Sequence, residues 1–259
     1  HRDLHSFPTR RSSDLDPLLA KIIVTGATRA EAVGKLRAAL AATVIAGIET
    51  NVDYLRAVCG SDAFAAGAFP TSLLRHFDYQ TRAIEVLEPG TQTTVQDFPG
   101  RLGYWHIGVP PSGPIDDKAF RIANEIVGNA PDAAGLEMSL IGPVLKFHHD
   151  AVIAATGADM GIPRWQPLLV KAGETIRFTP VQGAGARGYL AIRGGLDIPL
   201  YLGSRSTFIL GKFGGRQLRA GDLLRFNDTT IAEPKACENP PEYGNAWQIG
   251  VTYGPHGAP

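Results

Sequence analysis

The chain has 259 residues, and its 25 lysines and arginines balance its 25 aspartates and glutamates, so the formal net charge is +0. A neutral chain lacks the basic excess that attracts nucleic acid or an acidic membrane surface, and we expect neither as a partner. Hydrophobic residues make up 44% and charged residues 19% of the chain, which is typical of a globular protein and argues against wholesale disorder. No apolar run approaches the roughly 18 residues of a membrane span.

The cysteines and the paired histidines do not indicate a metal site. Cys59 and Cys237 are the only cysteines, and their spacing fits neither a metal nor a redox motif. We interpret them as reduced thiols, which predicts a cytoplasmic protein. His148 and His149 are adjacent, and adjacent side chains of a strand point to opposite faces, so they are poorly placed to chelate one ion.

Residues 1–15 differ from the rest of the chain. They show neither helical nor strand periodicity, and they lack the apolar core of a signal peptide. One nucleotide string that resembles a common sequencing adapter encodes all of them, so we interpret residues 1–15 as translated adapter; a natural polar leader is the alternative. Residues 253–259 are loop-like and follow a strand-like run at 247–252. We therefore interpret the chain as a fragment of a longer protein.

Residues 16–79 are predicted to form a small α+β part. An apolar stretch at residues 18–24 favours a strand. Thr28 and Glu31 have the spacing of a capping box, which predicts the start of a helix that continues to a break at Gly47. A second helix is predicted at residues 50–58, with Thr50 or Asn51 as cap, and a third short element at residues 72–77.

Residues 80–87 are predicted to link the two parts, and residues 88–259 have the pattern of a β-rich domain. The alternation at residues 84–87 indicates its first strand. Short strand-like runs then recur between glycine turns, at residues 93–95, 151–156, 168–170, 175–178, 189–192 and 223–226. One amphipathic helix interrupts them, with Asp116 as its N-cap and Gly128 as its stop signal.

A short internal sequence repeat indicates a repeated structural unit in this second part. Residues 171–178 and residues 219–226 both have a basic residue, an Ala-Gly turn, an acidic residue and then a strand-like run. A repeated turn followed by a strand fits a β-barrel.

The first candidate site lies around a Pro-Gly turn, where an amide, a carboxylate and a guanidinium fall close together. These are Gln96, Asp97 and Arg101, and Tyr104 follows them. Polar groups on a loop above a rigid sheet can hold a small polar substrate. The alternative is that Asp97 and Arg101 pair with each other to fix the turn.

The second candidate group lies near the start of the predicted helix. Ser112 and Asp116 precede a helix N-terminus, where free N–H groups favour a carboxylate ligand. Asp116 as a simple N-cap is the alternative, and no base accompanies Ser112. Glu137 stands alone in the apolar run at residues 133–140, where it must be paired or functional if buried. An ion pair with an arginine is the alternative for Glu137.

The third group follows two glycine-rich turns. Arg193 precedes a Gly-Gly pair, and Ser204 and Thr207 flank two further polar residues in the string Gly-Ser-Arg-Ser-Thr. Such donors suit a planar anion such as a carboxylate. The spacing is not that of a nucleotide-binding loop. A hydroxyl-rich turn between strands is the alternative.

The first part resembles the C-terminal domain of biotin carboxylases. The strings that carry the resemblance are residues 16–23, 27–32, 35–40 and 45–51, in the order found in that family. The resemblance implies the tail of an ATP-grasp enzyme, whose ATP and Mg would be bound upstream of this region. We therefore do not expect the first part to carboxylate anything by itself.

The second part resembles the carboxyltransferase family that includes urea amidolyase, allophanate hydrolase subunit 2 and a 5-oxoprolinase subunit. Many strings agree in order: residues 93–97, 111–114, 122–124, 127–129, 136–137, 156–158, 189–195 and 203–207. The resemblance implies a cyclophilin-like β-barrel with a helical insert, here truncated. The sequence departs from the family pattern at residues 160–163 and 213–218, where it is shorter.

A biotin-carboxylase tail joined to such a domain is similar to urea carboxylase. The resemblance implies transfer of a carboxyl group from carboxybiotin to urea, giving allophanate, with biotin on a carrier domain absent from this chain. The implied partners are urea or a similar amide and that carrier domain; homo-oligomerisation stays open. The fragment alone is expected to be inactive. The alternative is a binding or structural half of a two-chain allophanate hydrolase or 5-oxoprolinase complex.

The candidate residues divide into two roles under this interpretation. We expect Gln96, Asp97, Arg101, Tyr104 and Glu137 to be catalytic, with Gln96 and Asp97 as substrate holders. We expect Ser112, Asp116, Arg193, Ser204 and Thr207 to bind substrate. Whether urea, guanidine or another amide is the acceptor stays open.

Overall fold

The structure is a computed structural model that describes residues 18–43, 45, 50–67, 72–75, 77, 79, 82–227, 231–252 and 254. The chain divides into two compact units, residues 1–79 and residues 80–259, and each is described by itself. The adapter interpretation of residues 1–15 concerns positions outside the described residues. Gly47 also lies outside them, but the helix predicted to continue to it ends earlier, at Ala42, where Thr43 adopts an extended backbone. Among the described residues, no helix is both long and apolar enough to cross a membrane.

The described residues of the first unit form helices. They are α1 (Arg29–Ala42), α2 (Val52–Gly60), α3 (Asp62–Ala66) and the 3-10 turn η2 (Leu73–Arg75). The predicted cap of α1 is confirmed, because Thr28 Oγ1 accepts a hydrogen bond from the Glu31 N–H at 3.2 Å. Arg56 of α2 donates to the carbonyl oxygens of Leu40 at 2.9 Å and Thr43 at 2.8 Å, which ties the two helices together.

The first unit differs from expectation in two places: the described residues do not form the predicted strand, and they form one helix that was not predicted. Residues 18–24 form no strand. An extended segment becomes a strand only when a neighbouring strand completes its hydrogen bonds, and none of the β-ladders among the described residues includes this segment. Helix α3 was not predicted, although local signals mark both of its ends. Ser61 Oγ accepts from the Phe64 N–H at 3.3 Å, and Gly67 ends the helix at a φ of 78°.

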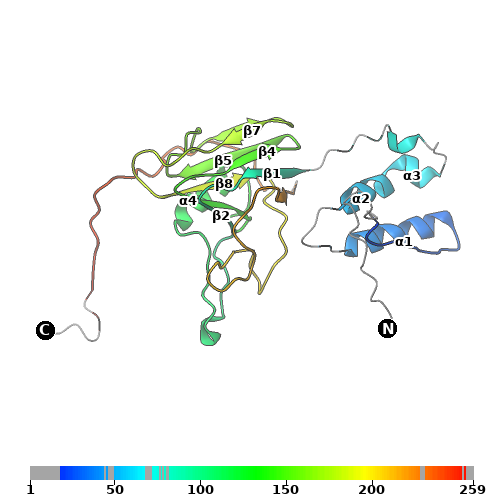
Figure 1. The fold of residues 1–259 in the computed structure, drawn as a ribbon, viewed down its shortest axis with the longest axis horizontal. Helices are drawn as coiled ribbons and strands as arrows, with labels where there is room; N and C mark the ends of the chain where they lie inside the picture. The colour runs from blue at the N-terminus through cyan, green and yellow to red at the C-terminus, as the bar shows by residue number, and fades with distance from the viewer. Residues whose placement is uncertain are drawn as a thin grey trace, which may run out of the picture. The chain divides into compact units, whose positions relative to one another are not determined.

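The second unit is built on two antiparallel sheets (Figure 1). The first has the order β7-β4-β1-β9 and contains β1 (Ala83–Glu88), β4 (Val144–Phe147), β7 (Thr175–Arg177) and β9 (Leu223–Arg225). The second has the order β2-β3-β8-β5-β6 and contains β2 (Gln92–Gln96), β3 (Gly135–Ser139), β5 (Ala151–Gly157), β6 (Pro167–Val170) and β8 (Arg187–Ile192). The predicted mixture of helix and sheet is confirmed. The barrel is not, because the described strands form two open sheets.

The main core lies between the two sheets. Its buried members include Ile84 and Leu145 from the first sheet and Leu136, Ile153 and Leu190 from the second. Each fully buried side chain of this kind contributes about 1.5–3 kcal/mol to stability. This core fixes the strand ends from which the polar loops extend.

Helix α4 (Asp117–Ile126) covers the five-stranded sheet with a second, smaller core. Ala123 and Ile126 of α4 pack with Ala154 of β5 and Ala191 of β8. Both faces of the central strands are thereby buried. This explains why β5 begins with the apolar run Ala-Val-Ile-Ala-Ala, without alternation of apolar and polar residues.

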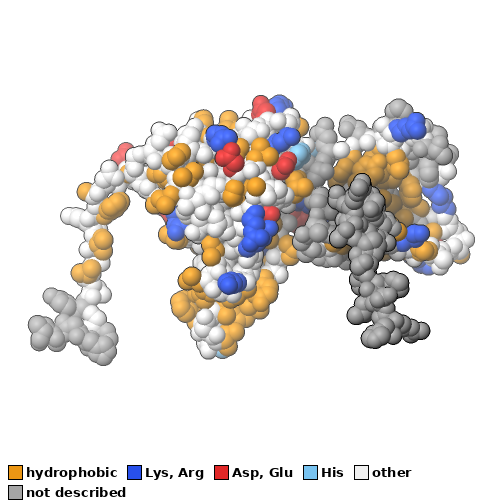
Figure 2. Space-filling model, viewed as in Figure 1, with side chains coloured by type: hydrophobic (Ala, Val, Ile, Leu, Met, Phe, Trp, Pro, Cys, Tyr) orange, Lys and Arg blue, Asp and Glu red, His pale blue; other side chains and the backbone are white. Residues whose placement is uncertain are grey.

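A long loop between β2 and α4 projects from the sheets and carries the 3-10 turn η3 (Trp105–Ile107) (Figure 1). Its exposed apolar side chains include Leu102, Trp105 and Ile107. They form part of the hydrophobic surface at the projecting tip in Figure 2.

The internal sequence repeat, residues 171–178 and 219–226, corresponds to a structural repeat inside one sheet. The N–H of Gly173 donates to the Phe147 carbonyl at 2.7 Å, and the N–H of Gly221 donates to the Val86 carbonyl at 2.8 Å. Both glycines have a left-handed φ, 89° and 88°. The strands that follow, β7 and β9, form the two edges of the same four-stranded sheet.

Candidate functional site

Asp97 is the centre of a buried polar network at the end of β2. It is 5% exposed. Its Oδ1 accepts hydrogen bonds from the hydroxyls of Ser204 and Ser206, both at 2.6 Å. Its Oδ2 accepts from the Arg205 N–H at 2.7 Å. Hydrogen bonds to a carboxylate are stronger than neutral ones, so this network fastens residues 204–206 to the end of β2.

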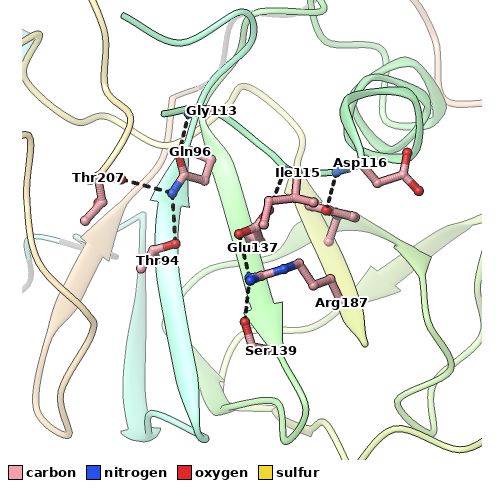
Figure 3. Close-up of polar contacts among 10 residues, drawn as sticks. Thr94, Gln96, Gly113, Ile115, Asp116, Glu137, Ser139, Arg187 and Thr207 are labelled. Atoms are coloured by element: carbon pink, nitrogen blue, oxygen red, sulfur yellow. Dashed lines mark hydrogen bonds and ion pairs between the residues drawn. The ribbon is translucent and has the colours of Figure 1, made fainter. Parts of the chain in front are cut away.

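Gln96 links the same strand end to two other segments (Figure 3). Its Nε2 donates to Thr94 Oγ1 at 3.0 Å and to the Thr207 carbonyl at 3.3 Å. Its Oε1 accepts from the Gly113 N–H at 3.1 Å. The amide therefore uses both of its ends within the protein, which fixes its orientation.

Arg101 lies beneath an aromatic cover. It is only 1% exposed, which is unusual for an arginine. Its Nε donates to the Tyr201 carbonyl and its Nη2 to the Ser206 carbonyl, both at 2.9 Å. The guanidinium carbon lies 5.6 Å from the ring centre of Tyr201 and 5.2 Å from that of Phe213. Asp97 and Arg101 thus take their partners from residues 201–206, and the alternative of a simple pair between them is wrong.

Two buried side-chain atoms in this region have no hydrogen-bond partner among the described residues. They are Arg101 Nη1 and Ser112 Oγ. An unpaired buried polar group costs about 1–3 kcal/mol, so such groups are few in native proteins. Ser112 is also held in the left-handed region, at a φ of 59°. These two atoms give the cluster unused capacity to bind a ligand oxygen.

The backbone brings the Ser112 segment against the Arg101 turn. The Arg101 N–H donates to the Pro111 carbonyl at 2.6 Å. A Cβ atom on Gly100, whose φ is 85°, would lie 2.6 Å from the same carbonyl oxygen. Only glycine therefore allows this approach of residues 99–101 to residues 111–113.

Glu137 and Asp116 form a second group at the start of α4 (Figure 3). Glu137 is 5% exposed, and its Oε1 accepts from Arg187 Nη1 at 2.9 Å while its Oε2 accepts from the Ile115 N–H at 2.8 Å. The arginine ion pair considered for Glu137 is therefore present. Asp116 caps α4, because its Oδ1 accepts from the Ala119 N–H at 2.9 Å.

Two tyrosines complete this second group. The Asp116 N–H donates to the Tyr189 hydroxyl at 2.8 Å, and the Tyr243 hydroxyl donates to Asp116 Oδ2 at 2.7 Å. Burial raises the pKa of Tyr189 far above its ordinary value, and the Glu137 charge raises it further. Burial, followed by the hydrogen bond to Asp116, also raises the pKa of Tyr243. Both phenols therefore stay protonated at neutral pH.

The structure brings eight of the ten candidate residues into these two neighbouring groups. Gln96, Asp97, Arg101, Ser112, Ser204 and Thr207 lie in the first, and Asp116 and Glu137 lie in the second. The segment at residues 113–115 connects the groups, since its N–H groups donate to Gln96 and Glu137.

Tyr104 and Arg193 lie apart from these two groups. Tyr104 is half-buried and precedes η3 on the projecting loop. Arg193 pairs with Glu233 at 3.4 Å and lines a pocket of about 150 Å³ with Asp150 and Phe226. No described contact connects either residue to Asp97 or Glu137.

Sequence reasoning left several residues out of the site, among them the two tyrosines, Ser206 and Arg187. Ser206 belongs to the string that carries Ser204 and Thr207, and its place between them was the available signal. Arg187 has no local signal; it reaches Glu137 because β8 pairs with β3, with Arg187 opposite Ser139. Among the described residues, no group of three or more His, Cys, Asp or Glu side chains could hold a metal ion.

Comparison with known proteins identifies the family. The model for "Carboxyltransferase domain, subdomain A and B" matches residues 107–258, and that for "Biotin carboxylase C-terminal domain" matches residues 9–76. The chain therefore belongs to the carboxyltransferase-domain family and joins that domain to a biotin-carboxylase C-terminal domain. This confirms both resemblances and places the chain in the biotin-dependent carboxylase family.

The similarity to individual proteins and solved structures is consistent with this family. The urea amidolyase of Lachancea kluyveri is 45% identical over 97% of this chain and 15% of its own length. The crystal structure of the K. lactis urea amidolyase matches with a TM-score of 0.80 at 43% identity, over 89% of this chain and 15% of that one. A 5-oxoprolinase subunit of Escherichia coli is 37% identical over 54% of this chain and 48% of its own length. The chain thus spans only a small part of its urea amidolyase relatives.

Proposed function

We propose that this chain is part of a biotin-dependent urea carboxylase and that its second unit transfers a carboxyl group to urea. One observation carries the proposal: a carboxyltransferase unit with two unused buried donors follows a biotin-carboxylase C-terminal domain in the same chain. The match to the urea amidolyase relative spans 97% of the chain, whereas the match to the 5-oxoprolinase subunit spans 54%. Membership of a two-chain complex fits this coverage less well.

The residues of the first group suit acyl transfer without a protein nucleophile. Attack of an amide nitrogen on the carboxyl carbon would form the new C–N bond, break the bond between that carbon and its carrier nitrogen, and pass the amide proton to the departing carrier; negative charge builds up on the carboxyl oxygens during the transfer. Arg101 Nη1 and Ser112 Oγ are donors that can stabilise this charge in a site shielded from water. Asp97 and Gln96 act through position, because they hold residues 204–207 and Gly113 around these donors. Access to Arg101 requires residues 213–214, which cover it, to move.

The residues present fit biotin. Biotin supplies the carboxyl group when bound, and its ureido and carboxyl oxygens are acceptors that match the two unpaired donors. The exposed apolar side chains Leu102, Trp105 and Ile107 of the neighbouring loop suit its hydrocarbon part. ATP and Mg belong to the carboxylase reaction upstream of residues 16–79. We further propose that the carrier domain belongs to the same polypeptide and that the enzyme is cytoplasmic.

Ser112 offers the sharpest test, because its hydroxyl has no partner whose loss would disturb the fold. In the full-length protein that contains this chain, Ser112→Ala is expected to lower urea-dependent ATP hydrolysis about 100-fold, the effect typical of a lost oxyanion donor. Thermal unfolding should not change. The matched control is Ser72→Ala, whose hydroxyl also has no described partner and which lies in the first unit.

Two further results decide the proposal. ATP hydrolysis that does not depend on urea in the unmodified protein would exclude urea as the acceptor. Ser112→Ala turnover equal to that of Ser72→Ala would remove Ser112 from the site. Asp97→Asn extends the test to the network, because it keeps the shape of the side chain while removing its charge.

A further inference from the structure

A pocket of about 670 Å³ lies beside the first group of site residues. Its lining combines an apolar part, formed by Pro89, Ile209 and Leu218, with a basic part formed by Lys212, Arg216 and Arg219. Its volume lies within the range of small-molecule sites, about 300–1,000 Å³. No acidic side chain is among its described lining residues.

The charges of this pocket are only partly neutralised. Arg216 makes a bidentate ion pair with Asp222, in which Nη1 and Nη2 each lie 2.7 Å from a carboxylate oxygen. The same carboxylate accepts from the Arg219 N–H at 2.8 Å. Neither Lys212 Nζ nor the Arg219 guanidinium has a hydrogen-bond or ion-pair partner among the described residues. Three cations and one neighbouring carboxylate leave a local charge of about two positive units.

The fold holds Lys212 at the pocket in an uncommon backbone conformation. Phe208 and Phe213 bridge across a tight turn, and the Lys212 N–H donates to the Ile209 carbonyl at 3.2 Å. Lys212 has a φ of 56°, which a lysine seldom adopts. A strained residue held by its surroundings is more common at binding sites than elsewhere.

The pocket and the first group share one backbone segment. Gly215 lines the pocket, and a Cβ atom there would lie 3.0 Å from Thr207 Oγ1. A Cβ atom on Gly214 would collide with Arg101 Nη2. A ligand in the pocket would therefore rest on the segment that covers Arg101.

We propose that this pocket binds an organic dianion, a phosphate monoester or a dicarboxylate attached to an apolar body. The two unpaired cations, Lys212 and Arg219, match a double negative charge. Pro89, Ile209 and Leu218 contact the apolar body, and the Asp222 pair orients Arg216 toward the ligand. The site is distinct from that proposed for urea, which is uncharged.

Calorimetric titration of the 259-residue chain tests the site. Phenyl phosphate and phthalate supply the two dianions on an apolar body, inorganic phosphate lacks the body, and benzyl alcohol lacks the charge. We expect one phenyl phosphate or phthalate per chain, at least tenfold weaker binding of inorganic phosphate and no binding of benzyl alcohol. The ratio of the two dissociation constants distinguishes the phosphate from the dicarboxylate.

Substitutions locate the binding. Lys212→Gln and Arg219→Gln should each weaken phenyl phosphate binding at least tenfold without shifting thermal unfolding, because both side chains are exposed. Lys118→Gln is the matched control, since Lys118 is exposed on α4 and does not line the pocket. Equal weakening by Lys118→Gln, or no binding of either dianion at millimolar concentration, would overturn the proposal.

Discussion

Ser204 donates a hydrogen bond to the carboxylate of Asp97 at 2.6 Å, although the two residues lie 107 positions apart in the chain. Ser204 is 1% exposed and Asp97 is 5% exposed, so this contact is removed from water. Asp97 directly follows β2, whereas Ser204 lies in the segment between β8 and β9. The network around Asp97 is therefore what gives the first group of site residues its shape.

Asp97→Ala should destabilise the second unit. It leaves the hydroxyls of Ser204 and Ser206 and the Arg205 N–H without their acceptor. We expect the free energy of unfolding to fall by at least about 3 kcal/mol, since one hydrogen bond to a charged group contributes about 1.5–3 kcal/mol and more than one is lost. Tryptophan fluorescence during urea unfolding reports on this unit selectively, because Trp105, Trp165 and Trp247 all lie in it.

Asp132→Ala is the control for that measurement. Asp132 is exposed, and its replacement should change the free energy of unfolding by less than about 0.5 kcal/mol. Similar losses for Asp97→Ala and Asp132→Ala would show that the Asp97 network adds little stability.

The Glu137–Arg187 pair should show strong coupling. Glu137 is buried, and replacing only one member leaves the other without its partner at the sheet. We expect Glu137→Gln and Arg187→Gln each to destabilise the second unit, and the double variant to be about 1–3 kcal/mol more stable than additivity predicts. Urea unfolding of the four proteins measures this coupling. Additive losses would show that the ion pair is incidental.

Local signals predicted much of this fold. Asp116 and the apolar spacing after it predicted α4, and Thr28 predicted the start of α1; in both cases the capping hydrogen bond spans three residues. The strand-like runs at residues 93–95 and 151–156 lie in β2 and β5. Such features depend on neighbours in the sequence, so the sequence contains the information needed to find them.

Long-range contacts were beyond the same reasoning. Arg187 reaches Glu137 across 50 positions, and this contact depends on the register between β3 and β8. Arg101 and Tyr201 meet across 100 positions. The sequence identified most of the polar residues of the site, but it could not show that Arg101 is covered or that Asp97 binds Ser206. Those facts arise from tertiary packing.

Tyr189→Phe should alter how stability depends on pH. The native pKa of Tyr189 lies above its unfolded value of about 10, so the tyrosine contributes its full stability below pH 10 and loses it progressively as the pH rises toward the native pKa. Removing the hydroxyl also removes the hydrogen bond from the Asp116 N–H. We expect a loss of about 1 kcal/mol at pH 7 and a shallower decline of stability between about pH 10 and 11.5.

Thermal unfolding monitored by tryptophan fluorescence from pH 7 to 11.5 measures this effect. Tyr104→Phe is the matched control, because no described hydrogen bond involves the Tyr104 hydroxyl. Parallel pH profiles for Tyr189→Phe and the unmodified chain would show that Tyr189 ionises as freely in the native state as in the unfolded one.

Gly214→Ala should damage the site more than an ordinary glycine substitution. Gly214 has a φ of 68°, and an added Cβ atom would collide with both Arg101 Nη2 and the Ser206 carbonyl oxygen. Gly173 has a φ of 89°, but no atom outside its own chain neighbours lies within 4 Å of its Cβ position. Gly173→Ala therefore isolates the backbone strain, about 1–2 kcal/mol, from the collision. Urea unfolding followed by tryptophan fluorescence should show that Gly214→Ala lowers the free energy of unfolding by at least about 1 kcal/mol more than Gly173→Ala. The reason is that the added Cβ atom must push apart Arg101 Nη2 and the Ser206 carbonyl, which are hydrogen-bonded. Equal losses of unfolding free energy for the two variants would mean that the segment covering Arg101 moves at little cost in free energy, so that the guanidinium is easily exposed.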